Sequence, residues 1–411
     1  MNETPRPSAG SNILARLIVL VGVLVFRSLV LAQEGPGPAV PDLRISPEER
    51  MKVFTKLWDS VNKRYFDPQF DGVNWLAVKE KYRRQAGATE NKVQLYGVLQ
   101  RMLGELQSSH LQLYLDVHFG TGLYAQPGPR QNPVSVEGQW VMSSIDDGSP
   151  AQLAGVQIGW ILTQWDGKPY GRDLDTTCDL DRKVRLRFID LRGQERILDV
   201  ACRVYTRAAR SPVKAVQTLN GGALYLRFTS FSGDIYKWLA DQVSRNSSAT
   251  AIVVDLRHNG GGEFAVVEKC LRPFFQQSAV FGEVRNRDGK LSAILKVPAN
   301  RMAYSGPVFV LVDEATGSGA EVFAAGIQES RRGIVIGRRS VGAVRNAKEF
   351  KLSSGFTVDI PHSDYTTAAG THLEGRGVIP DEPVKLTMKD FLENRDPDLE
   401  RLKELLRKNR D

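Results

Sequence analysis

The sequence predicts a mixed α/β fold made of a small helical unit, a β-rich module and a larger α/β domain, in that order. Residues 46–115 repeat apolar side chains at helical spacing, and residues 116–208 hold short β-like runs between turn signals. From residue 209 strands alternate with helices. Such alternation implies crossover units and a largely parallel sheet covered by helices.

The composition is that of an ordinary globular protein. The chain has 411 residues, enough for two or three domains, and a formal net charge of +8. Residues 1–32 hold three arginines and one glutamate, so without them 52 basic and 46 acidic residues leave +6. These charges are scattered and form no basic block, so we expect no nucleic-acid partner.

The N-terminus has the features of a signal peptide. Two arginines precede the apolar run Leu17–Phe26, which is too short for a comfortable membrane span, and a plausible cut lies before Gln33. Residues 33–45, rich in Gly and Pro, form a linker. Arg27 interrupts the apolar region, so an uncleaved anchor stays open as the alternative. We therefore expect export to the periplasm or outside the cell, and no membrane span beyond the leader.

The helical unit begins at a capping box. Ser46 and Glu49 have the spacing of such a box, and a proline occupies the first helical position. Two more helices are expected around Asn74–Gln85 and Asn91–Leu106. In the β-rich module the expected strands are Trp140–Ile145, Trp160–Trp165, Val184–Ile189 and Arg196–Val200.

The α/β domain is expected over residues 209–390, followed by a C-terminal helix within 391–411. Its predicted strands are Gly222–Phe228, Ala251–Leu256, Val308–Asp313 and Gly333–Gly337. Its predicted helices are Asp234–Ser244, Phe264–Phe275 and Ala320–Glu329. The charged amphipathic tail helix, Pro397–Leu406, is expected to pack on the outside.

Three cysteines give no zinc spacing. Cys178 and Cys202 fall in one module, and an exported protein can keep a disulfide between them. Because the number is odd, Cys270 or another cysteine stays free or pairs between chains. Three unpaired core cysteines are the alternative. We expect no metal and no cofactor.

Two predicted strand-to-helix turns carry the candidate chemistry. Three consecutive glycines, beginning with Gly260, follow the strand 251–256, so backbone N–H groups there can face a ligand. The next turn places Ser318 between glycines at the start of a helix, as a nucleophile requires. The alternatives are a plain tight turn at Gly260 and a helix-capping role for Ser318, which forms a capping-box pattern with Glu321.

A serine nucleophile needs a base, and imidazole suits proton transfer near neutral pH. Among five histidines, His110 directly follows a predicted helix in a polar turn. Taken alone this is a weak signal, because a histidine after a helix usually does no more than cap it.

Five segments follow one another in a recognisable order: Gly104–His110, Gly120–Leu123 with Gly148–Val156, Asp255–Gly262, Gly317–Glu321 and Glu374–Asp381. Together they resemble the tail-specific and tricorn-core serine proteases. The resemblance covers nearly the whole chain after residue 46. It implies a helical cap, a PDZ-like module and a crotonase-like α/β catalytic domain.

The resemblance also implies catalytic roles. Tail-specific proteases pair the serine with a lysine in a Gly-Lys step, where this chain has Gly342-Ala343. Lys348 is close in sequence but off the pattern, and we expect it to be a surface lysine on a strand. Tricorn-type members use a Ser-His pair on the cap and a glutamate near the C-terminus. The roles carried over are nucleophile Ser318, base His110, supporting Ser109 and Glu374, and oxyanion donors Gly319 with Gly260 or Gly261.

The PDZ-like module implies how substrate is held. PDZ domains add a peptide as an extra strand and capture its C-terminal carboxylate on loop N–H groups. The candidate loop is Gly120, Thr121, Gly122 and Leu123. The alternative is a structural module that only shields the site.

The sequence therefore predicts an exported serine peptidase that acts on unfolded or C-terminally recognised proteins. Because the family lysine is missing, a catalytically silent relative that binds peptides or other ligands stays open as the alternative.

Overall fold

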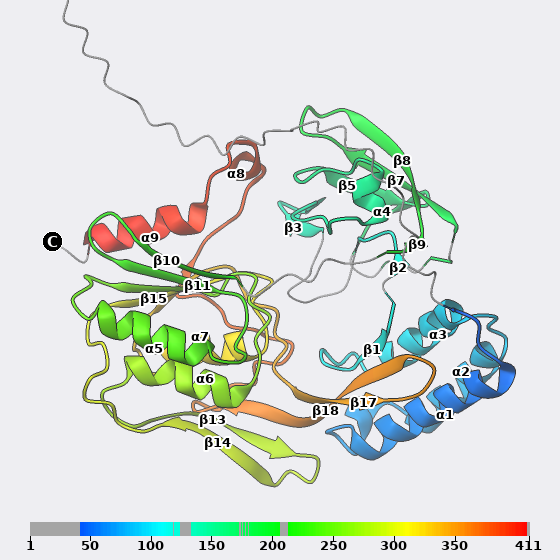
Figure 1. Cartoon of the computed structure of the whole chain (residues 1–411), viewed down its shortest axis with the longest axis horizontal. Helices are drawn as coiled ribbons and strands as arrows, with labels where there is room; N and C mark the ends of the chain where they lie inside the picture. Colours follow the sequence, from blue (N-terminus) through cyan, green and yellow to red (C-terminus); the bar gives the residue numbers. More distant parts are fainter. Residues whose placement is uncertain are drawn as a thin grey trace, which may run out of the picture. The chain divides into compact units, whose positions relative to one another are not determined.

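A computed structural model of the chain describes residues 42–408, apart from 118, 124–132, 172–173, 175, 177, 180 and 206–212 (Figure 1). The predicted leader and most of the linker lie outside the described residues. The predicted mixed α/β fold is confirmed, with helices first, then a β module, then a strand–helix alternation.

The cap consists of three helices, α1 (Pro47–Arg64), α2 (Trp75–Gly87) and α3 (Lys92–Gly104). The predicted capping box forms at α1, where the Glu49 N–H donates to Ser46 Oγ at 3.2 Å and the Glu49 carboxylate accepts the Ser46 N–H. An asparagine side chain caps each of the other two helices. Their apolar faces share one core with residues from the far end of the chain: Leu352, Phe356, Val358 and Ile360.

The β module is an antiparallel sheet with one short helix, α4 (Pro150–Leu153). Its strand order is β3-β4-β5-β7-β8, with β6 paired to β5. The strands are β3 (Val134–Val136), β4 (Gln139–Val141), β5 (Ile161–Trp165), β6 (Lys168–Pro169), β7 (Lys183–Ile189) and β8 (Glu195–Ala201). The predicted run to Ile145 is thus too long, because β4 ends at Val141 and the chain bends toward α4. Two further short strands, β2 (Phe119–Gly120) before this sheet and β9 (Arg203–Val204) after it, pair with each other.

A disulfide closes part of the β module. Cys178 and Cys202 are joined, with their Cα atoms 6.2 Å apart. Cys270 is free and buried in the α/β domain, where burial raises the pKa of its thiol to about 12. A thiol with so high a pKa is a packing residue rather than a nucleophile.

The α/β domain is built on a six-stranded sheet of order β10-β11-β12-β15-β16-β19. All its pairs are parallel except β10 with β11. Helices α5 (Ile235–Arg245), α6 (Phe264–Leu271) and α7 (Gly319–Glu329) share a core with one face, and α9 (Pro397–Lys408) packs on the other. The strands are β10 (Lys214–Thr218), β11 (Leu224–Phe228), β12 (Ile252–Asp255), β15 (Val308–Val312), β16 (Ile334–Gly337) and β19 (Glu382–Pro383). The predicted strands and helices of this domain are therefore confirmed.

A second sheet escaped the sequence analysis, apart from the strand assigned to Lys348. Its order is β1-β18-β13-β14, with β17 also paired to β18. The strands are β1 (Gln112–Leu115), β13 (Ala279–Asn286), β14 (Leu291–Val297), β17 (Asn346–Lys351) and β18 (Phe356–Thr367). Much of β14 and β17 is exposed, and β17 is mostly polar in sequence, so it gives little apolar signal. Because β1 directly follows the cap, its pairing with β18 ties the cap to the second half of the chain.

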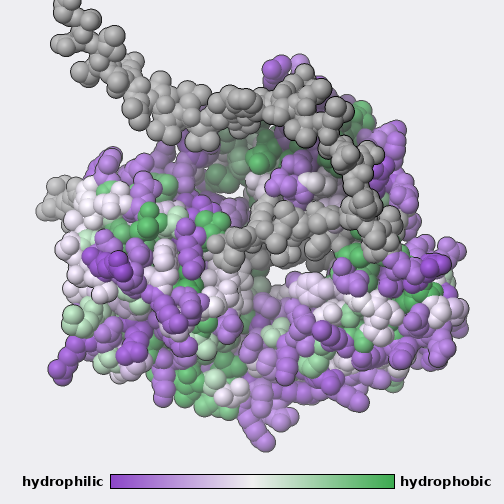
Figure 2. All heavy atoms as spheres, viewed as in Figure 1, coloured by the Kyte–Doolittle hydropathy of each residue, from purple (hydrophilic) through white to green (hydrophobic). Residues whose placement is uncertain are grey.

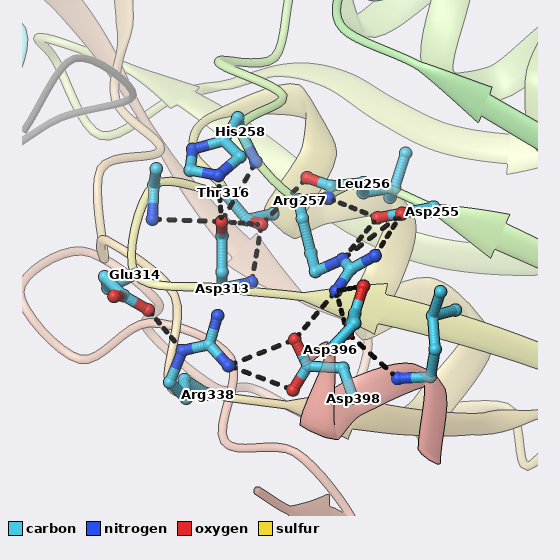
Figure 3. A network of polar contacts seen from close by, with 12 residues as sticks. Asp255, Leu256, Arg257, His258, Asp313, Glu314, Thr316, Arg338, Asp396 and Asp398 are labelled. Carbon is cyan, nitrogen blue, oxygen red and sulfur yellow. Dashed lines mark hydrogen bonds and ion pairs between the residues drawn. The ribbon is translucent and has the colours of Figure 1, made fainter. Parts of the chain in front are cut away.

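Ion pairs join the C-terminal segment to the residues that follow two strands of the parallel sheet, β12 and β16 (Figure 3). Arg257 follows β12 and Arg338 follows β16. Both guanidinium groups donate to the Asp398 carboxylate, at 3.0 and 2.9 Å, and Arg257 also pairs with Asp396 and Asp255. Asp398 is only 1% exposed, so this is a buried charge network rather than a surface ion pair. The network holds the chain just before two segments described below, the glycine turn at 260–262 and the segment 340–345.

Hydrophilic residues cover much of the coloured surface on the face seen in Figure 2. Within the part of the chain that the structure describes, no helix combines the length and the apolar character needed to cross a membrane.

Asp398→Asn should lower the free energy of unfolding by about 3 kcal/mol, because it leaves two arginines facing a neutral group inside the protein. Arg401→Gln, also on α9, removes a partly exposed ion pair with Glu382 and should cost less than about 1 kcal/mol. Urea unfolding of both variants measures the difference. Equal costs would mean that the Asp398 network is no stronger than a surface pair.

Candidate active site

The two turns singled out in the sequence lie against each other. They follow the neighbouring strands β12 and β15, and the Gly317 N–H donates to the Asn259 carbonyl at 2.9 Å. A Cβ atom at Gly261 would stand 2.5 Å from the Gly319 nitrogen and 2.6 Å from Ser318 Cβ. Only glycine permits this approach, so the three-glycine turn is required by its contact with the serine turn.

Ser318 stands at the N-terminus of α7 in an uncommon backbone conformation, with φ 54° and ψ −124°. The serine is half-buried. Its N–H donates to the Glu321 carboxylate at 3.0 Å, so the predicted capping-box pairing is present. A non-glycine residue at positive φ costs energy, and such residues concentrate at functional sites.

Two backbone N–H groups next to Ser318 have no partner among the described residues, those of Gly260 and Gly319. The N–H of Gly261, by contrast, donates to Asn259 Oδ1 at 2.9 Å. Asn259 is fully buried, and its side-chain amide is itself fixed by the Phe228 carbonyl at 2.8 Å. The asparagine therefore holds the turn in shape and leaves Gly260 as the available donor of the pair predicted from the sequence.

Glu321 organises the segment 340–345, which runs beside the serine turn. Its fully buried carboxylate accepts hydrogen bonds from Ser340 Oγ at 2.5 Å, Gly342 N–H at 2.7 Å and Ala343 N–H at 2.8 Å. Burial raises the pKa of Glu321, although these donors oppose the shift. The sequence suggested only a capping role for Glu321, because its partners lie about twenty residues further on.

His110, Ser109 and Glu374 form the second half of the site. Ser109 Oγ lies 2.9 Å from His110 Nδ1, and the Ser109 N–H donates to Glu374 Oε1 at 3.4 Å. The other Glu374 oxygen accepts the Val344 N–H at 2.9 Å. Burial lowers the pKa of His110, with Glu374 opposing the shift and Arg345 adding to it. A half-buried imidazole with a lowered pKa is neutral at pH 7 and can accept a proton.

The segment 340–345 thus connects the serine and the histidine. Glu321 holds its first part and Glu374 its last part. Among the described residues, no direct hydrogen bond joins the Ser318 hydroxyl to the His110 imidazole. The predicted catalytic residues therefore lie around the segment 340–345, with Ser318 on the α/β domain and His110 at the end of the cap.

The position of the family lysine is filled by Ala343, whose N–H is bound to Glu321. Lys348 is exposed on β17, as predicted. Two polar side chains that the sequence analysis did not place here are also close. Arg345 reaches Glu374, and His258 pairs with the buried Asp313, with Nε2 3.3 Å from Oδ2 (Figure 3). The position of His258 in the turn after β12 was an available sequence signal, whereas no local signal marked Arg345.

The loop Gly120–Leu123 lies in the β module. Thr121, Gly122 and Leu123 are buried, and the Leu123 N–H donates to Thr121 Oγ1 at 3.3 Å. Gly122 leaves no space for a Cβ atom, which would stand 2.4 Å from Ser149 Cβ at the start of α4. The loop is thus packed onto the short helix. Among the described residues, no group of three or more His, Cys, Asp or Glu side chains is placed to hold a metal ion.

Comparison with known proteins finds peptidase domains in this chain. Residues 222–384 match peptidase family S41, and residues 46–104 match the tricorn protease C1 domain. The chain is 26% identical over 374 residues to the carboxyl-terminal-processing protease of Synechocystis sp., covering 85% of this chain and 84% of that protein.

Two solved structures share the fold. Mature CPAF complexed with lactacystin has a TM-score of 0.66 at 15% identity, covering 88% of this chain and 98% of that one. The tricorn protease has a TM-score of 0.52 at 19% identity, covering 89% of this chain and 37% of the longer tricorn chain. With an S41 domain over the serine and glycine turns and a tricorn C1 domain over the cap helices, the predicted resemblance to the tail-specific and tricorn-core serine proteases is confirmed, and these two domains identify the chain as a serine peptidase.

Proposed function

We propose that this peptidase cleaves unfolded or C-terminally recognised proteins through an acyl-enzyme on Ser318. The observation that carries the proposal is the strained backbone of Ser318 at the start of α7, with the unpartnered N–H groups of Gly319 and Gly260 in the two touching turns. A nucleophile on a strained strand-to-helix turn beside free N–H donors is the arrangement that acyl transfer needs.

In this mechanism Ser318 Oγ attacks the peptide carbonyl while His110 Nε2 takes the hydroxyl proton. The tautomer that leaves Nε2 free carries its proton on Nδ1, which then donates to Ser109 Oγ. The developing oxyanion accepts the N–H groups of Gly319 and Gly260, each worth ~3 kcal/mol in the transition state. The proton passes to the leaving amine, and water then hydrolyses the ester with His110 as base. Glu374 holds Ser109 and thereby the imidazole.

We propose that substrate is presented by the β module, whose loop Gly120–Leu123 would capture a C-terminal carboxylate. Support comes from the sequence pattern of the loop and from the name of the Synechocystis relative, a carboxyl-terminal-processing protease. Because Leu123 N–H is already bound to Thr121 Oγ1, the loop must rearrange to receive a peptide. A base on the cap and a nucleophile on the α/β domain also suit gating by cap closure.

Ser318→Ala should lower kcat/KM by at least about a thousandfold while costing only about 1 kcal/mol of stability through the lost cap. Ser318→Asp should fold and be inactive, since aspartate caps a helix but cannot serve as this nucleophile. Ser318→Gly should be inactive and more stable than Ser318→Ala, because glycine adopts φ 54° without strain. Hydrolysis of an unfolded protein and thermal melts measure these effects.

Ser330→Ala, at the other end of α7, is the matched control and should keep full activity. A serine-directed fluorophosphonate should label the parent protein at Ser318 and leave the Ser318 variants unlabelled. Normal turnover by folded Ser318→Asp would remove Ser318 as the nucleophile and favour a silent relative or another nucleophile.

His110→Ala should reduce kcat/KM by roughly a hundredfold or more at neutral pH without unfolding the protein. A base must be unprotonated, so kcat/KM of the parent should rise with pH through the lowered pKa of His110 and be level above it. The rise should therefore lie below the ordinary histidine pKa of 6.5. His372→Ala, on an exposed histidine paired with Asp364, should keep the parent profile. Full activity of His110→Ala would exclude this base.

We also propose export. The proposal rests on the sequence of residues 1–32, and it predicts cleavage before Gln33. Mass spectrometry of the protein isolated from its native cells should find a mature chain that begins at or near Gln33. An intact Met1 on protein from the cytoplasm would contradict export, and an intact Met1 on membrane-bound protein would indicate an uncleaved anchor.

A further inference from the structure

Arg345 reaches from the segment 340–345 into the cap. Its Nη1 donates to Ser108 Oγ at 3.0 Å and to the Tyr65 hydroxyl at 3.3 Å, and lies 3.7 Å from the Asp71 carboxylate. Its guanidinium carbon stands 4.0 Å from the centre of the Phe66 ring. One side chain therefore contacts the end of α1, the loop after it and the segment that leads to His110.

The same arginine faces the Glu374 carboxylate. Arg345 Nε lies 3.8 Å from Glu374 Oε1, the oxygen that also accepts the Ser109 N–H. Only 13% of the Arg345 side chain is exposed, and within the described chain its Nε has no hydrogen-bond partner. A buried cation is stable only where anions and acceptors surround it, so Arg345 and its neighbours constrain one another.

We propose that Arg345 is a positioning residue that docks the cap onto the catalytic domain and holds Glu374, Ser109 and His110 in their working arrangement. It stands two residues after Ala343, so this chain carries a cation close to the place where tail-specific proteases carry their lysine. The role rests on the proposed function of His110 as base. Arg345 does not take up the serine proton, because a guanidinium stays charged at all working pH values.

The charge of Arg345 has a second effect on His110. The groups that bear on the imidazole are Glu374, which favours its protonated form, and Arg345, which disfavours it, together with burial. Asp71 and Tyr65 contact the arginine rather than the imidazole. Removing the arginine should therefore raise the pKa of His110 and loosen the cap, two effects that a purely structural arginine would not combine.

The test uses Arg345→Met and Arg345→Lys, each combined with Ser318→Ala so that activity is not needed for the readout. The full chain, labelled on histidine, is titrated by NMR, with His110→Ala assigning the resonance. We expect Arg345→Met to shift the His110 titration to higher pH. Arg345→Lys keeps the positive charge, so its His110 titration should lie close to that of the parent protein. With Ser318 intact, Arg345→Met should lose about 10- to 100-fold in kcat/KM, with the acid limb displaced the same way.

Arg287→Met is the matched control. Arg287 also docks on the cap from the catalytic domain, donating to the Tyr65 and Asn62 carbonyls, but it contacts neither Glu374 nor His110. It should leave the His110 titration unchanged. If Arg345→Met fails to fold, Arg345→Gln replaces it, because glutamine keeps hydrogen bonding without charge.

An unchanged His110 titration in folded Arg345→Met would overturn the proposal, and so would an equal shift in Arg287→Met. These outcomes are separate from failure of the proposed function. If His110 is not the base, His110→Ala stays active whatever the titration of Arg345→Met shows.

Discussion

The close contact between the two glycine-containing turns is the constraint on which the site depends. Gly261 and Gly319 bring the backbones of two neighbouring βα turns together where a Cβ atom would not fit. The approach leaves Ser318 at positive φ beside two N–H groups that have no partner within the described part of the chain. The parallel sheet supplies this geometry, since β12 and β15 are adjacent and their carboxyl ends open on the same edge.

Two carboxylates, one on the fully buried Glu321 and one on the half-buried Glu374, connect the turns to the cap. Glu321 and Glu374 accept backbone N–H groups from the two ends of the segment 340–345, so the position of that segment is set by hydrogen bonds rather than by packing alone. Arg345 leaves the segment toward the cap, and Ser109 arrives at Glu374 from it. The site is thus a continuous polar network built from residues 65 to 374, in which each carboxylate is shared between two parts of the chain.

The parts of this arrangement that depend on local sequence patterns could be predicted from the sequence. The alternation of strands with helices and the apolar runs predicted β11, β12, β15 and β16, and the glycine-flanked strand-to-helix turn indicated Ser318 as a candidate nucleophile. The second sheet was missed because its assembly depends on long-range pairing. β13 pairs with β14 and β17 with β18 as consecutive strands, but β18 joins these pairs to each other and to β1, which lies nearly 250 residues earlier. Arg345 was missed for a similar reason, since its partners are contributed by cap residues more than 230 positions earlier. Nothing local distinguishes it from a surface arginine.

The pairing of β1 with β18 has a consequence for biosynthesis. Gln112 lies opposite Asp359, so the strand that follows His110 finds its partner only after nearly 250 further residues have been made. Contacts of such long sequence separation form late, and a nascent chain folds its N-terminal parts first. The histidine and the serine therefore cannot be brought together while the chain is still short. We therefore expect the proposed peptidase site to assemble only after nearly the whole chain has been made.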